Sequence, residues 1–304
     1  MKKPDNWAYI FILPFFVVFA IFIAYPIGNT LWVSLTDESM TTFESNFIGL
    51  ENYFVELSQP LFWKALLNTL IIWLPNIISQ LAIGLGLAWI LTNARLRAKG
   101  SSFFRAIYFF PNLVTVASIA VLTYALFDWQ KGPINFLLFG TGPEDAKKYI
   151  WWFNDPRLSQ IIVSIIQTWM WFGYTMIMFI AGIQSISESY VEAAVIDGAN
   201  EWQVFRRITL PLLRPMMTYV LITSLIGGMQ IFDLPWVLTN GAGNAPGGVE
   251  NSLTTSMVYL YSRAFSWDQN LGGASAVSWL LFMFIATVSA IYLRATRDKE
   301  GDKP

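Results

Sequence analysis

Residues 158–187 read LSQIIVSIIQTWMWFGYTMIMFIAGIQSIS and contain no Asp, Glu, Lys or Arg. Arg157 precedes this stretch and Glu188 follows it. A helix needs about 20 predominantly apolar residues to cross the hydrocarbon core of a bilayer. The stretch is long enough to cross once, and we therefore predict a transmembrane helix near residues 159–183.

Other stretches between charged residues are long enough for the same role. Together they predict six membrane-spanning helices, near residues 8–34, 65–91, 104–126, 159–183, 216–237 and 272–293. The uncharged segment between Asp233 and Glu250 is rich in Gly and Asn, and we interpret it as a loop, because irregular backbone is not tolerated against lipid. The first apolar stretch is too long for the core of a cleaved signal peptide, so we expect an uncleaved helix there.

The composition agrees with a membrane protein. Hydrophobic residues make up 55% of the 304 residues and charged residues only 13%, whereas ordinary soluble domains have about a quarter charged residues. A soluble chain of this size cannot bury so much apolar surface, which argues against a soluble enzyme. The chain contains no Cys and no His, so thiolate and imidazole sites are excluded, and we predict no catalytic residue and no metal site. A net charge of −1 argues against a nucleic-acid partner, because binding to nucleic acid requires a basic surface.

The basic residues are unevenly distributed among the segments that join the predicted helices. With the N-terminus inside, 13 of the 19 Lys and Arg residues fall in cytoplasmic segments. Because short cytoplasmic loops are enriched in Lys and Arg, we predict that both termini are cytoplasmic. The outer segments, near 36–64, 127–158 and 238–271, are longer and contain many aromatic residues. Such residues suit either an interfacial aromatic belt or a docking surface for an external partner.

The predicted cytoplasmic segment between the fourth and fifth helices, residues 185–215, reads SISESYVEAAVIDGANEWQVFRRITLPLLRP. Ser187 can cap a helix, and the residues after it are good helix formers. Gly198 is typical of a helix–turn–helix corner, and a second short helix follows it. Pro211 and Pro215 precede the next membrane helix. A helix pair of this kind can project from the membrane into a cleft of a soluble partner.

This segment carries a long pattern with fixed spacing, formed by Glu192, Ala193, Ala194, Gly198, Ile208, Leu210 and Pro211. The pattern resembles the EAA loop of ABC importer permeases at each of these positions. Other stretches, among them FRAIYFFPNLV (104–114) and IFDLPWVLTNGAG (231–243), also resemble binding-protein-dependent carbohydrate permeases. The resemblance covers nearly the whole chain and is closest to the six-span, MalF-like sugar branch.

The resemblance implies an all-α integral membrane protein with six transmembrane helices and the type I permease fold of ABC importers. It implies one permease domain over residues 1–304, in which residues 185–215 form the cytoplasmic coupling loop. The implied partners are a second, homologous permease subunit, two cytoplasmic ABC ATPase subunits, an extracytoplasmic solute-binding protein, the lipid bilayer and a carbohydrate. The chain has no G-x-x-x-x-G-K-[ST] motif, so we expect no cofactor on it and expect ATP and Mg²⁺ on the ATPase chains.

In the coupling loop, a physical role can be given to the first part of the pattern. Glu192 offers a charge-assisted hydrogen bond to a basic group of the partner. Ala193 and Ala194 allow the partner to approach closely. At Gly198 a side chain would either clash or force the second helix to point elsewhere.

Polar and aromatic side chains occur together inside the predicted helices, where polar groups are costly and tend to face a cavity or another helix. A sugar site needs hydrogen-bonding groups together with flat apolar rings. Helical spacing places residues 167, 170, 171 and 174 on one face, with Trp169 roughly opposite. The candidate substrate pathway comprises Asn112, Gln167, Trp169, Trp171, Tyr174, Gln230 and Asp233.

Some polar and aromatic residues have a simpler interpretation. Asn76 and Gln80 are expected mainly to hydrogen-bond neighbouring helices. Asp233 lies close enough to the outer end of its helix to reach interfacial water, and Trp169 can equally pack between subunits. In the resemblance, cavity positions of the family match Asn112, Gln167, Trp169, Tyr174, Gly228, Gln230 and Ile231. Departures from the family example occur at Val116, Trp171, Gly228 and Ile231, so the resemblance does not indicate a particular sugar.

Three alternatives stay open on the sequence alone. A secondary transporter would be expected to contain an inverted repeat or an ion-coupling carboxylate within the membrane. Asp233 is the only carboxylate within a predicted span, and no repeat is evident. An ABC permease for a solute such as glycerol phosphate would be expected to have an Arg or Lys within the spans to bind the phosphate. A membrane enzyme would need a group of catalytic side chains, and the sequence contains no candidate for one.

Overall fold

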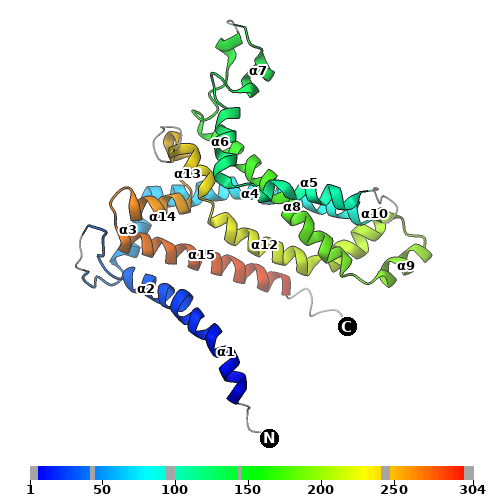
Figure 1. The fold of residues 1–304 in the computed structure, drawn as a ribbon, viewed down its shortest axis with the longest axis horizontal. Coiled ribbons are helices and arrows are strands. Elements are labelled where there is room, and N and C mark those ends of the chain that lie inside the picture. Colours follow the sequence, from blue (N-terminus) through cyan, green and yellow to red (C-terminus); the bar gives the residue numbers. More distant parts are fainter. Residues whose placement is uncertain (1–5, 42–44, 94–99, 143–144, 241–246, 298–304) are drawn as a thin grey trace. The chain divides into compact units, whose positions relative to one another are not determined.

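The structure is a computed structural model that describes residues 6–41, 45–93, 100–142, 145–240 and 247–297. Within these ranges the regular secondary structure is helical, apart from two isolated β-bridges, which confirms the predicted all-α class (Figure 1). The chain divides into two compact units. The smaller unit comprises Met1–Trp63 and Tyr259–Ala286, and the larger comprises Lys64–Val258 and Thr287–Pro304.

The described helices have the lengths and composition of a protein that crosses a membrane several times. Five candidate spans are Tyr9–Val33, Pro60–Thr92, Pro156–Gln184, Arg214–Thr239 and Leu271–Thr296. A sixth results if the bent pair Ser101–Leu113 and Val116–Leu126 is counted as one. All six coincide with the predicted spans. Most of the basic residues that predict the orientation, including those at 95–99 and 299–303, lie outside the described residues. Of the segment between Asp233 and Glu250 that we interpret as a loop, residues 241–246 also lie outside them, whereas Asp233–Asn240 is helical, so the loop prediction is wrong for that part.

The larger unit contains most of α4 and the helices from α5 to α13. Their bounds are α4 (Pro60–Thr92), α5 (Ser101–Leu113), α6 (Val116–Leu126), α7 (Pro133–Phe139), α8 (Pro156–Gln184), α9 (Glu188–Ile196), α10 (Glu201–Val204), α11 (Leu210–Leu212), α12 (Arg214–Met229) and α13 (Asp233–Asn240). A π-helical turn, η3 (Phe205–Thr209), joins α10 to α11, and short 3₁₀ turns lie at Asp145–Lys148 and Val249–Asn251. α5 packs closely on α8, because a Cβ at Gly173 would lie 1.9 Å from the backbone oxygen of Tyr108.

The third predicted span is not a single helix. α5 and α6 meet at 88°, and Figure 1 shows α6 turning away from α5. Val114 and Thr115 at the corner have extended backbone, and the Thr115 hydroxyl accepts the backbone N–H of Ser118 at the start of α6. Pro111 has no N–H to contribute to the last turn of α5, and the β-branched residues after it favour extended backbone. The expectation of one span near 104–126 therefore needs correction to a sharply bent pair.

The fifth predicted span is interrupted as well. α12 ends at Met229 and α13 begins at Asp233, with three non-helical residues between them. Gly227 and Gly228 precede the break, and Gly is the poorest helix former after Pro. At membrane depth, irregular backbone is tolerated only where it is buried in protein or lines a cavity. The break at residues 230–232 therefore indicates a cavity or a tightly packed interior beside it.

The smaller unit contains α1 (Asn6–Phe19), the π-helical turn η1 (Ala20–Ala24), α2 (Tyr25–Val33), α3 (Glu51–Ser58), most of α14 (Ser256–Phe265) and the start of α15 (Leu271–Arg297). Glu56 is fully buried and accepts hydrogen bonds from Arg263 Nη2 and from the Tyr259 hydroxyl, each at 2.6 Å. Arg263 also pairs with Asp268. Burial and the hydrogen bond to Glu56 raise the pKa of Tyr259. This buried pair joins α3 to α14.

Candidate functional site

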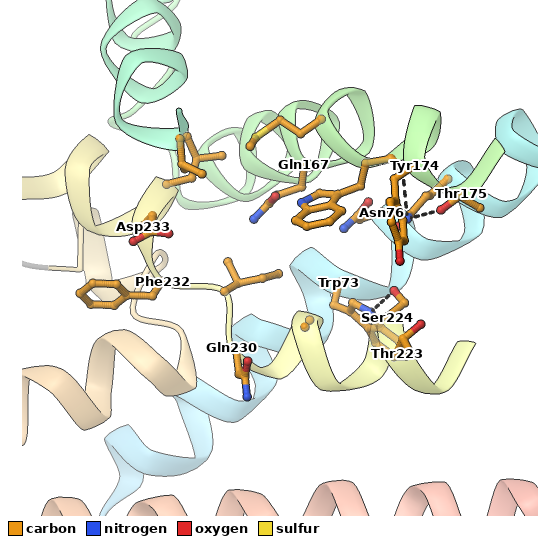
Figure 2. A pocket seen from close by; sticks show the side chains of 18 of the residues that line it. Trp73, Asn76, Gln167, Tyr174, Thr175, Thr223, Ser224, Gln230, Phe232 and Asp233 are labelled. Atoms are coloured by element: carbon orange, nitrogen blue, oxygen red, sulfur yellow. Dashed lines mark hydrogen bonds between the residues drawn. The ribbon is translucent and has the colours of Figure 1, made fainter. Parts of the chain in front are cut away.

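A cavity of about 340 Å³ lies in the larger unit, between α4, α8, α12 and the break before α13. Figure 2 shows Asp233 and Phe232 at one end of it and Tyr174 and Thr175 at the other. The polar and aromatic lining residues are Trp73, Asn76, Gln80, Gln167, Trp171, Tyr174, Thr175, Thr223, Ser224, Gln230, Phe232 and Asp233. Rings and amides therefore face the same space.

Hydrogen bonds between side chains fix the walls of the cavity relative to one another. Two of them join α4 to α8 and one joins α4 to α12. They run from Gln80 Nε2 to Thr175 Oγ1 (2.5 Å), from Thr168 Oγ1 to Asn76 Oδ1 (3.3 Å) and from Trp73 Nε1 to Ser224 Oγ (3.2 Å). The expectation that Asn76 and Gln80 hydrogen-bond neighbouring helices is confirmed, and both also line the cavity.

Gln167 differs from the other buried amides. Its side chain is only 8% exposed, and among the described residues it has no hydrogen-bond partner. Figure 2 shows it pointing from α8 into the cavity. A buried amide without a partner costs free energy, so its donors and acceptor are available to a solute or to water. Trp171 and Tyr174 lie along the same face of α8, with their rings perpendicular and 6.0 Å apart.

A segment that is buried at residues 252–256 and partly exposed at residues 248–251, within residues 247–256, holds the break that borders the cavity. The Thr255 hydroxyl donates to the carbonyl oxygen of Ile231, within the break, at 2.6 Å. Asn68 of α4 donates to the carbonyl oxygen of Asn251 at 2.7 Å, and Gln160 of α8 donates to the Asn68 side chain at 3.0 Å. The segment thereby connects the break to both long helices of the cavity.

Residues 187–212, which follow α8, form the predicted helix–corner–helix. Gly198 has a φ of +81°, in the left-handed region that favours Gly. The N–H of Ala199 donates to the carbonyl of Ala194 at 2.9 Å, and the N–H of Gly198 donates to that of Val195 at 3.1 Å. This pair of bonds is the Schellman motif, which ends a helix with Gly in the left-handed conformation. A capping box then starts α10.

An aromatic cluster packs the residues after the corner against the end of α4. The Trp89 ring lies 5.0 Å from that of Phe205 and 5.9 Å from that of Trp202. The Asn93 amide donates to Glu201 at 2.7 Å. These contacts are made to α4, and other residues of α4, namely Trp73, Asn76 and Gln80, line the cavity.

A family model described as "Binding-protein-dependent transport system inner membrane component" matches residues 80–297. The chain belongs to this family. Among its relatives, the lactose transport system permease protein LacF of Rhizobium radiobacter is 32% identical over 297 residues, which cover 97% of this chain and 96% of the relative. The chain is therefore a multi-pass membrane component of a binding-protein-dependent transport system, as its apolar helices indicate.

Solved structures share the fold of this permease. One is the crystal structure of a bacterial alginate ABC transporter in complex with alginate pentasaccharide-bound periplasmic protein. A chain of it has a TM-score of 0.78 and 19% identity, with coverage of 98% of this chain and 96% of the other. Another is the crystal structure of a bacterial ABC transporter involved in the import of the acidic polysaccharide alginate. A chain of it has a TM-score of 0.76 and 20% identity, with coverage of 98% of this chain and 97% of the other. These likenesses confirm the predicted ABC importer permease fold.

The permease brings most of the predicted pathway residues to one cavity. Those that line it are Gln167, Trp171, Tyr174, Gln230 and Asp233. Asn112 and Trp169 do not line it. Trp169 is 42% exposed on the opposite face of α8, as the helical spacing predicts, and Asn112 lies at the end of α5, just before the bend. A role for these two residues in the pathway stays a prediction without support from the cavity.

Sequence reasoning missed several lining residues, chiefly Trp73, Thr223 and Ser224. A signal for Trp73 was available, because residues 73, 76 and 80 share one helical face. No comparable signal marked Thr223 and Ser224, since hydroxyl residues are common in membrane helices and their importance depends on which helix lies opposite.

Two expectations about the predicted coupling residues need correction. Ala194 is only 8% exposed and faces the interior of the chain, so of the two alanines only the exposed Ala193 can offer close approach to a partner. At Gly198 an added Cβ would meet nothing within 4 Å, so no clash occurs within the described chain. Gly is required there by the positive φ alone. Glu192 is exposed, as expected, and the half-buried residues of the pattern are Ile208, Leu210 and Pro211.

Proposed function

We propose that this permease subunit forms the membrane passage of an ATP-driven importer for a carbohydrate. The observation that carries the proposal is the cavity, where the unpartnered amide of Gln167 lies on one helical face with Trp171 and Tyr174. Amides hydrogen-bond hydroxyl groups, and aromatic rings cover the apolar faces of sugar rings. The similarity to a lactose transport permease supports the same substrate class.

The proposed assembly contains a second, homologous permease, two cytoplasmic ABC ATPase subunits and an extracytoplasmic solute-binding protein. The binding-protein-dependent family supports the last of these partners. ATP and Mg²⁺ bind to the ATPase subunits, and this chain hydrolyses nothing and needs no cofactor. Residues 1–304 act as one permease domain in the cytoplasmic membrane, with both termini in the cytoplasm.

In the proposed mechanism, residues 185–215 couple the ATPase to the cavity. Glu192 on α9 bonds a basic group of the ATPase, and movement of α9 and α10 reaches α4 through Trp89. α4 then carries the movement to Trp73, which lies about 24 Å away along the helix at 1.5 Å per residue. The ATPase cycle thereby shifts the population between inward-open and outward-open cavities.

The sequence alternatives fit less well. No Lys or Arg is among the residues that line the cavity, which disfavours glycerol phosphate and similar anions. A secondary transporter does not agree with membership of a binding-protein-dependent family.

Uptake by the complete transporter in reconstituted vesicles tests the proposal. Gln167→Ala removes hydrogen bonds worth about 0.5–1.5 kcal/mol each, so the sugar concentration for half-maximal uptake should rise about two- to twelvefold. Tyr174→Ala should reduce uptake, and Tyr174→Phe should retain most of it if the ring is what matters. Ile165→Ala is a matched control, since Ile165 is 60% exposed on α8 and does not line the cavity. Normal uptake by both the Gln167→Ala and the Tyr174→Ala variants at limiting sugar would contradict a passage through this cavity.

A further inference from the structure

We propose that this cavity accepts uncharged or positively charged saccharides and disfavours anionic ones, and that Asp233 is the residue that sets this preference. The proposal rests on the carbohydrate function proposed above and narrows its substrate class. Relatedness and fold leave the charge open, because a 32% identical relative is named for lactose whereas the fold also serves a transporter of the acidic polysaccharide alginate.

The lining of the cavity is one-sided in charge. Its polar groups are amides, hydroxyls and indole N–H groups, its single carboxylate belongs to Asp233, and it includes no Lys or Arg. Proteins recognise carboxylates, sulfonates and phosphates mainly with Arg or Lys, or with the free N–H groups at the start of a helix. The first of these devices is missing from the described lining.

The second device is weakened. α13 begins at the cavity, so its N-terminus would be the place for an anion. Asp233 occupies its first turn, and Pro235 has no N–H to offer. The N–H of Trp236 is already donated to the carbonyl of Phe232 at 2.9 Å. A carboxylate of the protein therefore stands where an anionic solute would need to bind.

Asp233 has no structural task that explains it. Its side chain is exposed, and among the residues that the structure describes it forms no hydrogen bond and no ion pair. It cannot cap α13 through the N–H groups of residues 235 and 236, for the reasons just given. Nearby in the same cavity lies the buried Gln167 amide, which also lacks a partner within the described chain. Two polar groups without internal partners, one of them buried, thus face the same space.

These groups suit hydroxyl and ammonium groups of a solute. A carboxylate accepts two hydrogen bonds from neighbouring hydroxyls and attracts an ammonium group, whereas it repels a second carboxylate. At the effective dielectric constant of about 20 that applies near a protein surface, two like charges about 12 Å apart repel by an amount that corresponds to about a tenfold loss of affinity; closer charges repel more strongly, and added salt reduces the repulsion.

The test compares three methyl glycosides that differ in charge and otherwise at one position: methyl glucoside, methyl glucuronide, with a carboxylate in place of the C6 hydroxymethyl group, and methyl glucosaminide, with an ammonium group in place of the C2 hydroxyl. Their binding to the purified membrane complex, without the solute-binding protein, is measured by equilibrium dialysis. We expect the glucuronide to bind about tenfold more weakly than the glucoside at low salt, with a smaller difference at high salt. Asp233→Asn, which keeps the shape, should bring the two within about twofold. Glu51→Gln removes a carboxylate from an exposed site on α3 and should leave the difference unchanged.

Each contrary result has a distinct meaning. Equal binding of glucuronide and glucoside by the native complex overturns the charge preference. A tenfold difference that persists in Asp233→Asn overturns the role of Asp233. If no glycoside binds while the complete transporter imports saccharides, the preference is not set in this cavity and the inference is wrong, but the proposed function stands. If the complete transporter imports no saccharide and imports another solute, the proposed function itself fails.

Discussion

Replacing Gly173 by Ala tests the close contact between α5 and α8. A Cβ at this position would lie 1.9 Å from the backbone oxygen of Tyr108 and 2.9 Å from the Cα of Phe109. Real Cβ contacts are essentially never shorter than 3.0 Å, so α5 and α8 must separate by at least 1.1 Å. Because the obstacle is backbone, no change of rotamer can relieve it. The next residue, Tyr174, lines the cavity, so the displacement reaches the site.

Overpacking of this kind lowers the free energy of unfolding by about 1–3 kcal/mol. That corresponds to about a 5- to 160-fold lower ratio of folded to unfolded protein. Gly86→Ala is the matched control, because Gly86 also lies within a long helix and an added Cβ there meets nothing within 4 Å. Ala should stabilise that helix by up to about 1 kcal/mol. The two variants should therefore differ in sign.

The apparent melting temperature of the purified complex in detergent, followed by size-exclusion chromatography, measures both variants, and uptake measures the effect on the cavity. The double variant Gly173→Ala with Tyr108→Ala should be no more stable than the single one, because the Tyr108 side chain is not the obstacle and its ring packs against Phe104 and Phe172. Equal stability of the Gly173 and Gly86 variants, or rescue by Tyr108→Ala, would refute the described packing of α5 on α8.

Four further predictions concern Gly198, Trp89, Arg263 and the orientation of the chain in the membrane. Gly198→Ala should weaken copurification of the ATPase, because Ala in the left-handed region costs about 1–2 kcal/mol. Gly198→Asn should retain more of the copurified ATPase, and equal effects of the two variants would contradict a conformational cause. Trp89→Ala should lower stimulated ATP hydrolysis and uptake together, Trp89→Phe should keep both, and an unaffected alanine variant would exclude α4 as the connection. Arg263→Met should destabilise the complex by about 3–5 kcal/mol because it leaves the Glu56 carboxylate buried without its cation; adding Glu56→Gln should recover part of the loss, and no recovery would argue against the ion pair. In intact cells a cysteine placed at Asp145 should react with an impermeant thiol reagent and one at position 97 should not; the reverse would overturn the predicted orientation.

The membrane class and the approximate positions of the spans could be predicted from local sequence. A run of residues without charge is a local property, and the cost of burying a charge in lipid makes it decisive. The corner at Gly198 was predictable for a similar reason, since the preference of Gly for positive φ depends only on its own missing side chain. The face of α8 that carries Gln167, Trp171 and Tyr174 followed from the helical period alone. In each case the information lies within one turn or one helix.

The location of the cavity and the contacts that hold its walls could not be predicted from local sequence. The break after α12 is stabilised by Thr255, which is 24 positions from Ile231 along the chain, and the walls are joined by Trp73 and Ser224, which are 151 positions apart. The burial of Ala194 and the contact of Gly173 with α5 are equally invisible to local patterns. Such contacts depend on how helices pack, and packing is settled by the shapes of surfaces that come together only when the chain folds.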